Sequence, residues 1–165
     1  MALPNRVLPG FSATLYAQDT ATPTPLTIAE LSTWADVNPI AIEANIIPVE
    51  AIPAFGQDDA MANFNVAGSR QSDKIPTQAP PTSMTITAAW NPADTQLLQM
   101  RDDAYNGTID RTFVIMATDG TGNYVAYAFN GRVGQWDVDT NPTAEAKCSF
   151  TIHPRGNQYG WSNNP

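Results

Sequence analysis

One cysteine, Cys148, and one histidine, His153, carry the most reactive side chains of this chain. A thiol beside an imidazole base forms a nucleophilic pair, so a small hydrolase using these two residues is one hypothesis. They lie five positions apart on one expected strand and therefore on opposite faces of it. Cys148 shares its face with apolar residues, which predicts a small buried side chain, and His153 before a proline at the strand end is typical of a surface histidine.

Paired carboxylates are a second possible source of chemistry, because glycosidases place two of them across a cleft. The sequence offers three such pairs, Asp58-Asp59, Asp102-Asp103 and Asp137/Asp139. Neighbouring acids of this kind are common in acidic proteins, so they are weak evidence. Residues 119–123 have the composition of a calcium loop but lack its acidic spacing and closing glutamate, which favours a hairpin turn. We therefore expect no catalytic residue, no cofactor and no metal site.

The overall charge of the chain also limits its function. Sixteen acidic residues against eight basic ones give a net charge of −8, and no basic residue lies between Arg6 and Arg70. Such an acidic protein disfavours tight binding of nucleic acid. Charged residues make up only 15% of the chain, where about a quarter is usual, which indicates a surface that largely faces other protein. We expect no internal disulfide, no secretory signal and no membrane contact.

The elements that would hold these residues are mostly strands. Residues 84–90 alternate apolar and polar side chains, as a half-buried strand does. The helix at about 92–106 should begin at Asn91 and Pro92 and end at Asn106-Gly107, and Thr27 with Glu30 has the spacing of a capping box for a short helix over 28–34. We expect further strands at 11–17, 40–49, 61–67, 113–118, 124–129, 132–138 and 144–152, with a two-residue turn at Asn130-Gly131.

These elements predict a mainly β fold, a two-sheet β-sandwich or barrel with one flanking α-helix. We expect a single domain over 1–165. This domain begins with an N-terminal arm over 1–10, and a long loop over 53–81 interrupts it. Pro154-Arg155-Gly156 should end the last strand, which leaves residues 157–165 as an extended C-terminal arm.

The order of elements from Thr82 to Gly156 resembles that of a known family. A threonine-rich strand ends in Ala89-Trp90, a helix follows, then come a hairpin around Asp119-Gly120, a strand with Gly134 and Trp136, and a last strand over 143–152. This pattern resembles the major tail-tube proteins of siphophages, including the lambda-like group. The resemblance covers nearly half of the chain, and the first half matches more loosely.

The resemblance implies a structural virion protein that is not an enzyme. Its subunits would form stacked hexameric rings, and the rings would make the channel for genome ejection. The implied partners are further copies of the chain, a tape measure protein, a tail terminator and tail-tip proteins, while phage DNA passes through the lumen without specific binding. The implied location is the virion tail, assembled in the host cytoplasm. Joining the sheets of neighbouring subunits would also remove their exposed edges.

We expect the contacts for ring stacking and the lumen among charged residues of the long loop, the helix end and the C-terminal region. The candidates are Asp58, Asp59, Arg70, Asp73, Lys74, Asp102, Asp103 and Arg155. A virion-associated carbohydrate-binding β-sandwich module is the alternative function. It would use an aromatic face formed from Trp34, Trp90, Trp136 and Trp161, although packing in the core or at a subunit interface is the simpler explanation for tryptophans that do not cluster in sequence.

Overall fold

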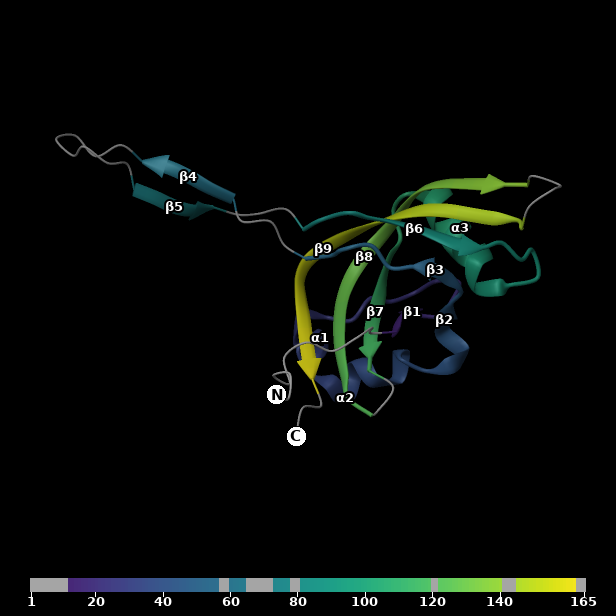
Figure 1. The fold of residues 1–165 in the computed structure, drawn as a ribbon, viewed down its shortest axis with the longest axis horizontal. Coiled ribbons are helices and arrows are strands. Elements are labelled where there is room, and N and C mark those ends of the chain that lie inside the picture. The colour runs from purple at the N-terminus through teal and green to yellow at the C-terminus, as the bar shows by residue number, and fades with distance from the viewer. Residues whose placement is uncertain are drawn as a thin grey trace, which may run out of the picture.

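A single curled sheet dominates the computed structural model, which describes residues 12–56, 60–64, 73–77, 81–119, 122–140 and 145–162. Its strand order is β2-β1-β7-β8-β9-β6-β3, and β4 and β5 form a separate two-stranded sheet that stands away from it (Figure 1). The bounds are β1 Ser12–Ala17, β2 Ile46–Ile47, β3 Val49–Ala51, β4 Ala60–Phe64, β5 Asp73–Thr77, β6 Met84–Ala89, β7 Asp110–Thr118, β8 Tyr124–Asp139 and β9 Lys147–Ser162. The predicted mainly β, barrel-like fold is confirmed.

The sheet curls so far that its two end strands are consecutive in the chain. β2 pairs with β1 and β3 pairs with β6, and Pro48 alone separates them. One bent strand therefore nearly closes the barrel. The predicted strand over 40–49 is wrong in its first part, where the 3-10 helices Asn38–Ile40 and Glu43–Asn45 lie. Pro39 is the second residue of the first one, and the buried Asn45 side chain donates a hydrogen bond to the Ile40 carbonyl.

Three α-helices accompany the sheet within the described residues: α1 Ile28–Leu31, α2 Trp34–Val37 and α3 Thr95–Asn106. The predicted capping box of α1 is present, with Thr27 and Glu30 bonding each other's backbone. α3 begins later than predicted, because the Asp94 carboxylate caps it, while Asn91 bonds the Ala93 N–H in a turn ahead of it. Gly107 ends α3 with a φ of 65°, as predicted. No helix in the described ranges is long and apolar enough to span a bilayer.

The predicted turn at Asn130-Gly131 is wrong, because β8 runs through both residues without a break. Asn130 pairs with Thr112 of β7, and its side chain bonds the Thr112 hydroxyl and the Leu26 carbonyl. A Cβ on Gly131 would lie 3.0 Å from the Ile152 side chain. Gly131 is thus required by close packing within the sheet.

The last strand also continues past its predicted end. β9 passes through Pro154 without a break. Its register against β8 shifts after the pair Asn130 and Arg155, and Gly156 of β9 adopts a φ of 73° at this irregularity. β6 pairs with β9 only up to Ile152, so the following part of β9 is an edge strand, where proline is tolerated. Residues 157–162 of the predicted C-terminal arm are strand, and residues 1–11 and 163–165 lie outside the described residues.

Two apolar cores cover the two faces of the sheet. The larger one joins α3 to one face, and its members include Ile86, Leu97, Met100, Phe113 and Phe150. The smaller one joins α1 and α2 to the opposite face around Leu31, Val37, Val114 and Ala128. Helices therefore cover only part of the sheet. The part of the second face that α1 and α2 leave uncovered is a candidate functional surface.

Candidate assembly interface

The two reactive side chains lie apart, as predicted. Cys148 is buried, its thiol points at the Ala88 carbonyl at 3.6 Å, and burial raises the pKa of that thiol. His153 is exposed on the other face, with its Nδ1 atom 2.8 Å from the Ser83 hydroxyl. In the described ranges no three His, Cys, Asp or Glu side chains gather in a way that could hold a metal ion.

The charged residues predicted from the long loop are only partly described. Asp58, Asp59 and Arg70 lie outside the described residues. Asp73 begins β5, and Lys74 follows it with an exposed side chain. The described part of the predicted loop is therefore a two-stranded hairpin that presents a lysine to solvent.

The two acids near the end of α3 have different surroundings. The Asp102 side chain is exposed and pairs with its neighbour Arg101 at 2.9 Å. The Asp103 side chain is 3% exposed and accepts from the Arg111 Nε atom at 2.7 Å. Burial raises the pKa of Asp103, and the Arg111 guanidinium opposes this rise. Asp103 thus acts inside the fold, while Asp102 lies at the surface.

Arg155 belongs to a charge cluster that the sequence did not reveal. Its Nη1 atom lies 2.6 Å from Asp110 Oδ2, and Arg132 Nε lies 3.1 Å from Asp110 Oδ1. One carboxylate from β7 thus joins arginines from β8 and β9, and the three side chains carry a net charge of +1. Arg155 remains 56% exposed, so it stays accessible. Only strand register could have predicted this cluster, since Asp110 lies opposite Arg132.

One face of β6, β9 and the end of β8 is polar where these strands extend beyond β7. Thr85 and Thr87 of β6 lie opposite Thr151 and Ser149 of β9, and Asp137 of β8 lies opposite Ser149. We call these five residues the hydroxyl face. The larger core and α3 lie on the other side of the same strands. The lysine of β9, Lys147, bonds Glu50 of β3 and ties the end strand to this part of the sheet.

The same part of the sheet has edges without a strand neighbour, and α3 packs against β8. β7 begins at Asp110 opposite Arg132, so within the described chain residues 133–138 of β8 have a strand neighbour on the β9 side alone. β3 ends the sheet on the other side, next to β6. We call residues 133–138 the β8 edge. Unpaired strand edges of this kind are templates for pairing with another chain.

The four tryptophans do not form one aromatic face. Trp34 contacts Tyr124 and Trp161 with ring centroids 5.8 and 5.4 Å away, against the smaller core. Trp90 meets Trp136 edge-on at 5.7 Å, and both pack on the larger core. Packing within the subunit accounts for all four.

The fold of this chain recurs in solved structures, although no family model and no curated protein matches its sequence. A chain of the PVC extracellular contractile injection system, in its extended sheath–tube complex, has a TM-score of 0.66 and 11% identity over 96% of this chain and 93% of its own. A chain of the anti-feeding prophage tube-terminating cap has a TM-score of 0.66 and 10% identity over 98% and 95%. The SPP1 tail tube has a TM-score of 0.51 and 14% identity over 94% and 77%. At these identities the likeness establishes a shared fold.

Proposed function

We propose that this chain is a structural subunit, without enzymatic activity, that assembles with copies of itself into a tail-like tube. The tube would consist of stacked hexameric rings and provide a channel for genome ejection. The fold shared with the SPP1 tail tube supports this proposal. The narrower assignment to the lambda-like siphophage group rests on the sequence pattern of residues 82–156.

The observation that carries the proposal is the pair of open edges beyond the barrel. Four strands, β3-β6-β9-β8, form this part of the sheet, and the β8 edge and β3 bound it. Pairing the β8 edge of one subunit with β3 of the next would continue the sheet from subunit to subunit. Such a head-to-tail contact closes into a ring when the rotation permits, and a closed ring leaves no edge exposed.

The hydroxyl face is the surface that such a ring would turn toward its lumen. α3 and the larger core occupy the other side of these strands, which leaves the hydroxyl face without a covering element among the described residues. Threonine and serine hydroxyls with Asp137 offer a polar lining, and Lys147 and Arg132 on the same face of the strands are paired with Glu50 and Asp110. In a subunit of net charge −8, this lining would let phage DNA pass without specific binding.

Ring stacking and the other tail components complete the proposal. The β4–β5 hairpin is our candidate for ring-to-ring contacts, together with Asp58, Asp59, Arg70, Asp73, Lys74, Asp102 and Arg155. A tail terminator, tail-tip proteins and a tape measure protein are the proposed partners, and the likeness to a chain of a tube-terminating cap assembly supports a terminator among them. The proposed place is the virion tail, after assembly in the host cytoplasm.

A substitution in the β8 edge tests this proposal. Val138 lies in this edge with its side chain 39% exposed. Val138→Lys should leave a folded subunit that no longer forms rings or tubes, because a lysine on an edge strand opposes further pairing. Val138→Thr is the matched control and should assemble normally. Negative-stain microscopy shows whether each variant forms tubes, and circular dichroism shows whether it is folded. Normal tubes from Val138→Lys would contradict the proposed pairing of the β8 edge with β3. A protein that never assembles but is retained on glycan columns would favour the carbohydrate-binding module.

A further inference from the structure

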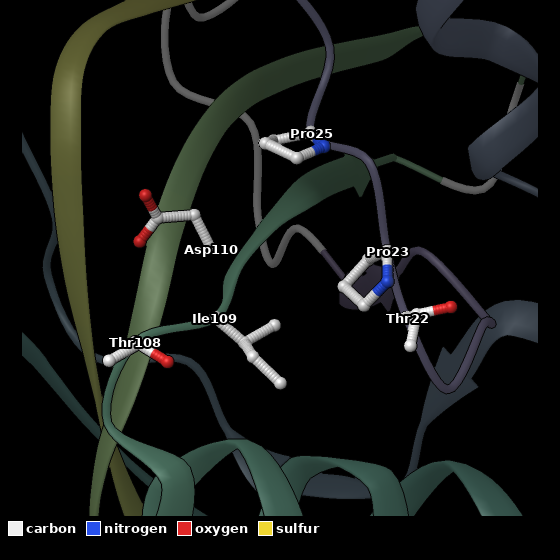
Figure 2. Close-up of a pocket in the computed structure, with 6 residues that line it drawn as sticks. All are labelled: Thr22, Pro23, Pro25, Thr108, Ile109 and Asp110. Carbon is white, nitrogen blue, oxygen red and sulfur yellow. The ribbon is translucent and has the colours of Figure 1, made fainter.

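A hollow of about 350 Å³ lies beside the barrel, between the segment after β1 and the segment before β7. Its lining residues are Thr22, Pro23, Pro25, Thr108, Ile109 and Asp110, and we call it the Pro23 pocket. Figure 2 shows the Ile109 side chain directed toward Pro23, while the Asp110 carboxylate points away from both. That carboxylate is engaged by Arg132 and Arg155. The inner surface of the pocket is therefore apolar and suits an uncharged side chain.

One wall of the Pro23 pocket is held in place by side chains from elsewhere in the fold. The backbone before the wall accepts hydrogen bonds from Gln96 at the Ala17 carbonyl and from Arg111 at the Gln18 and Thr20 carbonyls. After the wall, Thr112 accepts from the Leu26 N–H and Asn130 donates to the Leu26 carbonyl. These buried and half-buried groups fix an irregular segment at both ends, and two prolines restrict it between them. A pocket ordered in advance loses less entropy when it is filled.

The hairpin carries the side chain that fits such a pocket. Met61 of β4 is 52% exposed, so the hairpin presents a large apolar side chain to solvent. The other large exposed apolar side chains belong to the main body of the molecule: Ile28, Ile42, Ile46, Tyr105 and Val138. β4 and β5 pair with each other and with no other described strand, and the hairpin extends away from the barrel (Figure 1). An isolated two-stranded hairpin is marginally stable in water, so it gains from a partner surface.

Charge supports a second copy of the chain as that partner. Met61 lies opposite Pro76 and Asn63 opposite Lys74, so Met61 and Lys74 share one face of the hairpin. The segment that leads into the wall of the Pro23 pocket carries the exposed acid Asp19. A local pair of opposite charges, Lys74 and Asp19, would offset the repulsion between two copies that each carry a net charge of −8.

We propose that Met61 of one subunit inserts into the Pro23 pocket of another subunit, with Lys74 directed toward Asp19. The contact joins two different surfaces of the chain, so each copy offers one projecting side chain and one pocket, and the contact propagates through an assembly. The flexible thioether of methionine adapts to an irregular apolar pocket. This inference rests on the proposed tube function and specifies which residues join one subunit to the next.

Cysteine cross-linking of assembled material tests the contact. In a Cys148→Ala background, Met61→Cys is combined with Thr22→Cys, and the assembled protein is oxidised and separated on a non-reducing gel. The matched control combines Met61→Cys with Glu43→Cys, since Glu43 is exposed and does not line the pocket. We expect a ladder of covalent multimers from the Thr22 pair and none from the Glu43 pair. Ladders of equal strength from both pairs would overturn the inference.

Microscopy of the same samples separates the two proposals. Tubes without a Thr22 ladder would overturn the Met61 contact and leave the tube function intact, whereas failure of the parent protein to assemble in any buffer would overturn both. A second series uses single variants. Met61→Leu should assemble like the parent, and Met61→Asp should raise the concentration needed for assembly by at least about tenfold, because a carboxylate would enter an apolar pocket. Unchanged assembly of Met61→Asp would also overturn the contact.

Discussion

Asp103 and Arg111 form the most demanding electrostatic contact within the subunit. Both side chains are almost fully buried, and the arginine also donates to the carbonyls of Gln18 and Thr20. A buried guanidinium that loses its carboxylate keeps its charge and its desolvation cost. The pair therefore fixes the position of the segment after β1 relative to α3, and through it one wall of the Pro23 pocket.

Removing either of the two neighbouring acids should have very different effects on stability. Asp103→Ala should lower the free energy of unfolding by about 3–5 kcal/mol, because it leaves Arg111 buried without its carboxylate. Asp102→Ala should change it by less than about 0.5 kcal/mol, since that side chain is exposed. Urea titration followed by circular dichroism measures both variants. Equal stabilities would contradict the assignment of Asp103 to an internal role.

Cys148 should be inert in the folded protein. Its thiol is buried, and its raised pKa lowers the thiolate fraction near pH 8, so iodoacetamide should not modify it there. The same reagent should modify it within minutes in denaturant. Mass spectrometry of the intact protein records the added mass, and rapid labelling of the folded chain would contradict the burial of this residue.

The sequence identified some of these residues without their partners. Asp102 and Asp103 lie near the C-terminal end of a helix, where acids oppose the helix dipole. Their different surroundings depend on Arg111, which lies on the following strand and meets only one of them. Hydrogen bonds between residues far apart in the chain, such as those of Gln96 and Asn130, leave no pattern that a reading along the sequence can detect.

At the level of elements, strong periodicity predicted well and local turn signals predicted poorly. β6 follows its alternating pattern, and α3 ends at Gly107 as its sequence indicated. Asn130-Gly131 is a favourable hairpin turn in isolation, but pairing on both sides and the close approach of Ile152 hold it in a strand. Tertiary packing, which a local pattern does not contain, decided that case.

The β4–β5 hairpin should be dispensable for folding and essential for assembly. Thr82 N–H donates to the Gly56 carbonyl at 3.2 Å, so the two ends of the segment lie close together and a short glycine–serine linker can replace residues 57–80. Because β4 and β5 pair only with each other among the described strands, the variant should still melt cooperatively. Sedimentation and negative-stain microscopy should show no tubes. Tubes of normal length would contradict the role of the hairpin.

At the level of the whole molecule, the low fraction of charged residues and the unpaired strand edges both favour contact with other protein. A chain with 15% charged residues leaves much of its surface suited to other protein, and the sheet beyond β7 supplies edges for such contacts. The barrel itself is nearly closed by the bent strand at Pro48. The subunit is thus expected to be stable alone and to join others through its extended sheet and its hairpin.

A cryo-electron microscopy reconstruction of the assembled protein tests the central claim most directly. Our account predicts a tube of stacked rings in which the β8 edge of each subunit pairs with β3 of the next, with the hydroxyl face turned to the lumen and Met61 seated beside Pro23 of another copy. A protein that stays monomeric at high concentration in virion-like buffer, or a tube whose lumen is lined by α3, would contradict it.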